Sequence, residues 1–177
     1  MNQAMNQRPV HKLSAHKLSL VVQYASDVQI MPTRAQLRRW VKSALQRDVR
    51  MTLRIVDETE GRELNKRYRG KDYATNVLTF VYDDEPTPHG LPLSGEGVLS
   101  GDAVICAPVV EREAAAQHKD LLAHYAHLAI HAALHLQGYD HEDDSDAAEM
   151  EALEAALMLK LHFPNPYQTT HIANGRP

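Results

Sequence analysis

The chain has 177 residues, a formal net charge of −4 and a single cysteine. One cysteine excludes an intramolecular disulfide and a cysteine-rich zinc site, and no window reaches the roughly 18 apolar residues that a membrane span needs. The length suits a single domain, expected over 18–167, between flexible tails at 1–17 and 168–177. The polar N-terminus lacks the apolar core of a signal peptide, so we expect a cytoplasmic protein without a membrane partner.

The net charge hides a division along the chain. Residues 1–72 contain 15 Lys and Arg against 7 Asp and Glu, whereas residues 73–177 contain 4 against 16. Clustered cations neutralise phosphates and release counterions, so the asymmetry is typical of a protein that binds nucleic acid. Solvated helix faces produce the same runs of charge, and charge alone leaves both interpretations open.

The basic half predicts two strand–helix pairs. Residues 18–24 (LSLVVQY) are rich in β-branched side chains and predict a strand, and Thr33 predicts the N-cap of a helix to about residue 46. Residues 50–56 alternate as a second strand, and residues 57–69 predict a helix with an acidic first turn. The first helix has an apolar face and, opposite it, a basic face of Arg34, Arg38, Lys42 and Arg47.

Two further strands are predicted around a long loop. Residues 76–82 (NVLTFVY) form the third strand and residues 98–106 the fourth. Between them, residues 83–97 contain three prolines and three glycines among polar residues, which predicts a loop. Gly101 interrupts the fourth strand, and a glycine there indicates a bulge or a close backbone approach.

The remainder of the chain predicts helices. Pro108 opens one of them, at a position where proline is tolerated. Residues 119–137 form the most apolar helix, and residues 146–161 form another, with Asp146 and Glu149 placed as in a capping box. Four strands and several helices together predict an α+β protein.

The apolar helix ends in HAALHLQGYDH (131–141), which contains three histidines around a glycine. His131 and His135 are four residues apart, so they lie on one helix face, one turn from each other. Gly138 accepts the left-handed conformation that ends a helix and lets the chain bring His141 back toward them. We therefore predict a metal site on His131, His135 and His141.

Other interpretations of these side chains remain. A histidine on an apolar helix is often a hydrogen-bonded core residue. His127 also lies four residues before His131, but three successive turns cannot converge on one tetrahedral metal, so we expect His127 to pack or to orient a ligand. Asp140 and Glu142 flank His141, and either of them would be able to close the site or orient a ligand.

The residue types of the motif limit the chemistry. Three imidazoles with an open fourth position are typical of catalytic zinc, although nickel and copper also bind imidazole. The spacing is that of the zinc proteases, in which a glutamate after the first histidine is the general base. Here that position is Ala132. A peptidase would lack its proton acceptor, so peptide hydrolysis is disfavoured.

Three segments in order resemble the YbeY family, the bacterial zinc-dependent endoribonucleases of ribosomal RNA maturation. They are ELNKRYRGKDYATNVLTF (63–80), GDAVICAPVV (101–110) and HAALHLQGYDH (131–141). The chain departs from the family pattern at Ala132, where glycine is frequent, and at Thr79, where serine is usual. Both changes replace one small residue by another, so the resemblance extends over about residues 18–167.

The resemblance implies a zinc-protease-like α+β fold with a four-stranded mixed sheet packed by helices. It implies one Zn²⁺ per chain on His131, His135 and His141, and a catalytic role for Arg69. The implied activity is cleavage of single-stranded RNA in maturation of the 16S rRNA 3′ end and in ribosome biogenesis. Ribosomal RNA, the small ribosomal subunit and ribosome-associated proteins are the implied partners.

Two alternatives to this activity stay open at the level of sequence. In the first, the protein is a zinc-stabilised ribosome-assembly factor that binds RNA without cutting it. In the second, it is a relative of the metallopeptidases. Because the chain shows no evident protein base, a nuclease built on it would rely on the metal to polarise the scissile phosphate or to activate water. Arg69 would hold a phosphate oxygen with its guanidinium.

Overall fold

The computed structural model describes residues 16–82, 97–140 and 143–168. The elements in chain order are β1 (Leu18–Ala25), α1 (Arg34–Ser43), β2 (Asp48–Val56), α2 (Glu58–Arg69), β3 (Val77–Tyr82), β4 (Val98–Cys106), α3 (Ala107–Ala116), α4 (Leu121–Leu136) and α5 (Asp144–Lys160). The four strands and five helices confirm the predicted order. Apart from Gly97, the predicted loop at 83–97 lies outside the described residues.

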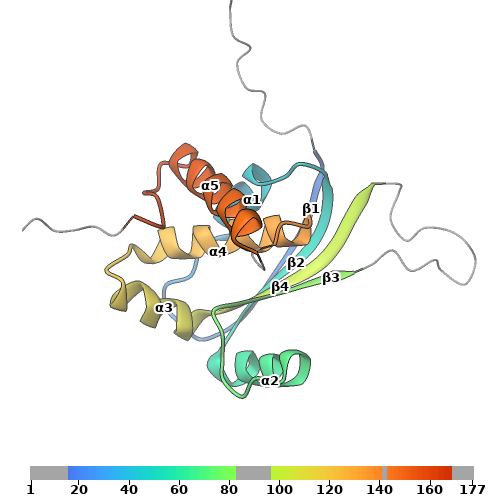
Figure 1. The fold of residues 1–177 in the computed structure, drawn as a ribbon. Helices are drawn as coiled ribbons and strands as arrows, with labels where there is room; N and C mark the ends of the chain where they lie inside the picture. The colour runs from blue at the N-terminus through green and yellow to red at the C-terminus, as the bar shows by residue number, and fades with distance from the viewer. Residues whose placement is uncertain (1–15, 83–96, 141–142, 169–177) are drawn as a thin grey trace, which may run out of the picture.

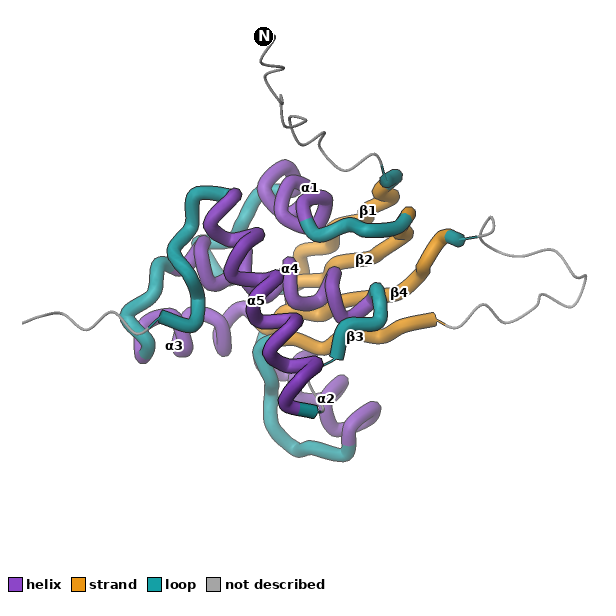
Figure 2. The backbone as a smooth tube through the Cα atoms, turned by 45° about the horizontal axis from the view of Figure 1, so that its top comes forward, coloured by secondary structure: helices purple, strands orange, loops and turns teal. Residues whose placement is uncertain are grey.

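The four strands form one mixed sheet in the order β1-β2-β4-β3. β1 and β4 pair in parallel with β2, whereas β3 pairs antiparallel with β4. Helices α1 and α4 cover one face, α5 packs against α4 on the side away from the sheet, and α2 lies on the opposite face (Figures 1 and 2). The predicted α+β class and four-stranded mixed sheet are confirmed.

Helix α4 is the centre of the core. It packs against α1, α3 and α5 as well as against β3 and β4, and eleven of its sixteen residues are buried. An apolar surface on nearly every side suits a helix surrounded in this way. Because α4 is packed on so many sides, its histidines project from a rigid element.

No helix within the described ranges is long and apolar enough to cross a membrane.

Gly101 lets α4 approach the sheet closely. A Cβ atom at this position would lie 2.3 Å from the Phe80 carbonyl oxygen and 2.7 Å from the Leu136 Cδ1 atom. Neither distance is tolerable for a real side chain, and the first involves backbone that cannot rotate away. Of the two roles that the sequence leaves open for this glycine, a bulge or a close backbone approach, the structure supports the close approach, which brings Leu136 of α4 and the Phe80 backbone of β3 against the same point of β4.

We expect Gly101→Ala to lower the free energy of unfolding by about 1–3 kcal/mol, because overpacking shifts strand β3 or helix α4. Urea denaturation followed by circular dichroism measures the change. Ser100→Ala, one residue earlier in the same strand, is the control and should stay within about 0.5 kcal/mol of the parent. Equal stability of the two variants would show that the sheet absorbs the extra methyl group.

The helix caps agree with the sequence prediction at one end of the chain and differ at the other. Thr33 and Gln36 form a capping box at the start of α1. At α5 the predicted Asp146 and Glu149 box is wrong. The Asp143 carboxylate accepts hydrogen bonds of 2.9 Å from the backbone N–H groups of Ser145 and Asp146, so the helix begins two residues earlier.

Three of the cations on the basic face of α1 bind backbone carbonyls of β1 or just before it. Arg34 donates to the Val22 carbonyl at 3.3 Å and Arg38 to the Leu18 carbonyl at 3.2 Å, and Lys42 donates to the His16 carbonyl. An edge strand exposes backbone groups that would otherwise pair with another chain. These cations therefore protect the sheet edge, which explains part of the positive charge of the first half without a phosphate ligand.

Candidate metal centre and cleft

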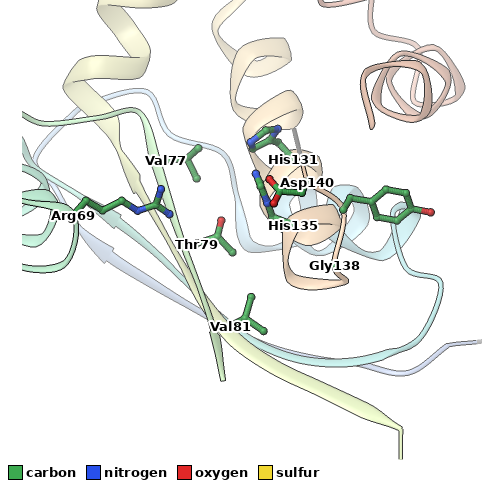
Figure 3. Close-up of a pocket in the computed structure, with 9 residues that line it drawn as sticks. Arg69, Val77, Thr79, Val81, His131, His135, Gly138 and Asp140 are labelled. Carbon is green, nitrogen blue, oxygen red and sulfur yellow. The ribbon is translucent and has the colours of Figure 1, made fainter. Parts of the chain in front are cut away.

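The end of α4 has the conformation that the glycine predicts. Gly138 has a φ of +94°, in the left-handed region. Its N–H donates to the His135 carbonyl at 3.0 Å, and the Tyr139 N–H donates to the Leu134 carbonyl at 3.2 Å. This pair of bonds is the Schellman motif. The chain turns back after it, and Asp140 lies beside His135 (Figure 3).

A cavity of about 420 Å³ lies between this helix end, strand β3 and the end of α2. It is lined by Arg69, Val77, Thr79, Val81, His131, His135, Gly138, Tyr139 and Asp140. Alternate residues of β3 face it, as the period of a strand requires. Figure 3 shows the Arg69 side chain extending from α2 toward the two histidines. Arg69, His131 and His135 are thus brought together from segments far apart in the sequence.

The two histidines are arranged as neighbouring ligands would be. Their ring centroids are 4.7 Å apart, with the ring planes at 78°. The third predicted ligand, His141, and the neighbouring Glu142 lie outside the described residues. Among the residues that are described, no three His, Cys, Asp or Glu side chains form a group that would hold a metal ion. The described part of the chain supplies two of the three predicted ligands.

A buried carboxylate on α5 supports this pair. Glu154 has no exposed surface, and its oxygens lie 2.7 Å from Nδ1 of His131 and 3.0 Å from Nε2 of His127. The Tyr167 hydroxyl also donates to Glu154. Burial alone would raise the pKa of Glu154, but the hydrogen bonds from His127, His131 and Tyr167 outweigh it and lower the pKa to about 2. The carboxylate is therefore ionised at neutral pH.

An ionised carboxylate accepts hydrogen bonds only, so Nδ1 of His131 is the donor in its 2.7 Å contact with Glu154. In the neutral ring, Nε2 then has the lone pair that a metal requires. Metal-bound histidines commonly donate their second ring nitrogen to a carboxylate, which fixes the ring and raises its basicity. The donor set and its buried support fit a divalent metal of the zinc type.

His127 belongs to the support of the site. Its Nε2 atom lies 3.0 Å from Glu154 and 3.1 Å from the Tyr167 hydroxyl, and it does not line the cavity. Sequence reasoning missed Glu154 altogether. The available signal was its spacing, because it lies midway between Met150 and Met158 at intervals of four on the buried side of α5. A carboxylate in an apolar stripe requires partners.

The cations of α2 divide into two sets. Arg62 and Lys66 bind Asp72 at 2.9 and 3.3 Å, on the exposed surface of the helix. Arg67 and Arg69 follow in the last turn and are exposed, and within the described residues neither of them forms an ion pair. Only Arg69 lines the cavity. The structure therefore separates Arg69 from neighbours that the sequence alone does not distinguish.

Comparisons with known proteins find several chains that are similar to this one. A solution structure of TM1509 from Thermotoga maritima matches 84% of this chain and 99% of its own, with a TM-score of 0.49 and 22% identity. Two proteins named Endoribonuclease YbeY, from Nitrosospira multiformis and Herminiimonas arsenicoxydans, are each 53% identical to the chain. The first alignment covers 90% of this chain and 86% of the relative, and the second covers 88% and 98%.

The family described as Endoribonuclease YbeY has a model that matches residues 22–162. That range contains all three segments by which the sequence resembles the family, and it includes Arg69, His131 and His135. With more than half of the chain matched and relatives at 53% identity, the chain belongs to the YbeY family of endoribonucleases.

Proposed function

We propose that this protein is a zinc-dependent endoribonuclease that cuts single-stranded precursor RNA in maturation of the 16S rRNA 3′ end, in the bacterial cytoplasm. The observation that supports it most is the cleft in which Arg69 faces His131 and His135 (Figure 3). A cation opposite a pair of metal-binding histidines suits a phosphodiester, whose charge increases in the transition state. Ribosomal RNA in the small subunit is the proposed partner.

The residues have separate tasks in this proposal. His131, His135 and His141 hold one Zn²⁺, which supplies Lewis-acid polarisation of the scissile phosphate or of the attacking water. Arg69 binds a non-bridging phosphate oxygen and orients the phosphate toward the zinc site. Glu154 keeps the His131 ring in the orientation and tautomer that ligation needs. Val77, Thr79 and Val81 form the wall of β3 against which the substrate lies.

The absence of a protease base at position 132 supports a nuclease over a peptidase. Ala132 has no exposed surface and lies in the core of α4. A longer acidic side chain there would have to displace packed neighbours and bury a charge. In the proposed reaction this position therefore supplies no carboxylate base, and a metal held by the histidines would supply Lewis-acid polarisation instead.

The test is cleavage of an end-labelled RNA oligonucleotide by purified protein whose zinc content is measured by elemental analysis. We expect internal cuts in the single strand, slower cutting of the same sequence in a duplex, and loss of cutting after chelation. A product with a 5′-phosphate and a free 3′-hydroxyl indicates direct attack by water, whereas a 2′,3′-cyclic phosphate indicates attack by the ribose hydroxyl. Tight RNA binding without any cleavage would favour the assembly-factor alternative.

Glu154→Gln should weaken zinc binding by about 10- to 100-fold, as substitutions of such carboxylates do in other zinc sites. The amide keeps the volume but loses the charge, and its nitrogen cannot accept the His131 or His127 proton. Competition with a chromogenic chelator measures the zinc affinity, and thermal unfolding shows that the fold is kept. Glu151→Gln, on the exposed side of the same helix, is the control. Equal zinc affinity in both variants would remove Glu154 from the site.

A further inference from the structure

Two exposed tyrosines lie together where α2 ends beside strand β3. Tyr68 is 58% exposed and Tyr82 is 53% exposed. Aromatic rings usually bury most of their surface, so a pair of open rings indicates a binding surface. Tyr68 contacts Phe80 edge to face, with the ring centroids 5.0 Å apart. Phe80 and Tyr82 occupy the same face of β3, so the three rings form one continuous surface.

The exposed rings are held in place by their neighbours. The Tyr82 hydroxyl donates to the Asp102 carboxylate of β4. That hydrogen bond, together with burial and the nearby Tyr68 hydroxyl, raises the pKa of Tyr82 to about 12. The Arg67 guanidinium lies 5.5 Å from the centre of the Tyr68 ring. Stacking of a ligand on these rings would therefore cost little side-chain entropy, because the tyrosines are already held in place.

This aromatic surface adjoins the proposed active site. β3 is an edge strand, with Val77, Thr79 and Val81 facing the cleft and Phe80 facing Tyr68 on the other side. Tyr68 directly precedes Arg69, which lines the cleft. An extended polymer that crosses this strand edge would touch the rings and the cleft at once.

We propose that Tyr68 and Tyr82 form a stacking platform for unpaired bases that flank the scissile phosphate of RNA, an inference that rests on the proposed function. Charge favours a nucleic acid over a protein segment, since exposed Arg67, Arg69 and Lys71 lie within five residues around Tyr68. Stacking on aromatic rings tolerates any base and requires it to be unpaired. The platform would thus select single strands, because bases in a duplex already stack on each other.

The test measures binding of the zinc-loaded protein to a fluorescein-labelled single-stranded RNA with 2′-O-methyl groups, by fluorescence anisotropy. Gel analysis after each titration checks that the RNA is intact. Tyr68→Leu should weaken binding by about 5-fold or more, whereas Tyr68→Phe should bind within about twofold of the parent because it keeps the ring. Replacing the bases by abasic spacers should weaken binding to the parent more than binding to Tyr68→Leu, which keeps only the Tyr82 ring. An unchanged affinity in Tyr68→Leu, or an equal loss on both oligonucleotides, would overturn the platform.

Salt dependence separates stacking from phosphate binding. Tyr68→Leu should leave the slope of log Kd against log salt unchanged, whereas Arg67→Ala should reduce it by about 0.7. Val21→Ala, an exposed apolar residue on the opposite edge strand, should change neither value.

If Tyr68→Leu is unstable, Tyr82→Leu with Tyr82→Phe as its control repeats the test. A parent protein that cuts unmodified RNA while both tyrosines prove irrelevant overturns the platform alone, whereas a parent that neither cuts nor binds RNA overturns the proposed function as well.

Discussion

Replacing His131 by alanine should remove bound zinc and lower the rate of RNA cleavage by more than about 100-fold, because the metal contributes several kcal/mol of transition-state stabilisation. The loss of zinc affinity should exceed that of Glu154→Gln, because His131→Ala removes a proposed ligand and also removes a hydrogen-bond donor to Glu154. Glu154 would then lie beside the space left by the imidazole, with only His127 and Tyr167 as hydrogen-bond partners. Elemental analysis of dialysed protein and single-turnover cleavage of an end-labelled oligonucleotide measure the two effects.

The control for this substitution is a histidine outside the cleft. His118 has a φ of +52° between α3 and α4, so His118→Asn is chosen because asparagine tolerates the left-handed region. This variant should keep its zinc and its cleavage rate. Full zinc content in folded His131→Ala would contradict the proposed ligand set. Cleavage by zinc-free His131→Ala at the parental rate would contradict a metal-dependent reaction.

The sequence predicted the histidine-bearing helix α4 and its end well because the signals are local. The apolar period, the two histidines one turn apart and a glycine at the helix end all act within about ten residues, and the structure has Gly138 in the left-handed conformation. Gly101 was predictable for a related reason, since a glycine inside a strand has few explanations. What the sequence left undecided was which of two glycine roles applies, and the distance from Phe80 identifies a close approach.

The support of the site was not predictable because it depends on packing between distant elements. Glu154 lies 23 residues after His131, and nothing local indicates that α5 lays this carboxylate against α4. The basic face of α1 was ambiguous for the same reason, since only the position of β1 shows that its cations bind backbone carbonyls. The Asp143 cap was missed because Asp143 and Asp146, three residues apart, are both able to cap the helix.

The ion pairs and hydrogen bonds of the basic half show which of its cations already have protein partners and which remain near the cleft. Arg34 and Arg38 of α1 are bound to a sheet edge, and Arg62 and Lys66 are bound to Asp72, whereas Arg69 in the last turn of α2 lines the cleft. That turn also has the C-terminal end of a helix dipole, which favours cations there. The excess of positive charge in residues 1–72 is therefore larger than the charge available to bind RNA. Arg69 is the arginine on which the proposed reaction depends.

Arg69→Ala should lower the cleavage rate by about 10²- to 10³-fold, the usual loss when one preorganised donor to a developing negative charge is removed. Zinc content should be unchanged, because Arg69 lies across the cleft from the histidines (Figure 3). Arg69→Lys should recover only part of the rate, since an ammonium group keeps the charge but loses the two-pronged geometry of the guanidinium. Single-turnover kinetics at saturating RNA separates this effect from weaker binding.

The matched control is Arg112→Gln, which removes an exposed arginine that pairs with Glu58 at 2.8 Å and does not line the cleft. Its cleavage rate should equal that of the parent, because a surface ion pair contributes little to stability. If Arg69→Ala keeps its zinc, its fold and its full cleavage rate, the arginine has no part in the reaction. If it binds RNA less tightly but cuts at the parental rate once saturated, Arg69 positions the strand, and the stabilisation of the phosphate charge must come from the metal alone.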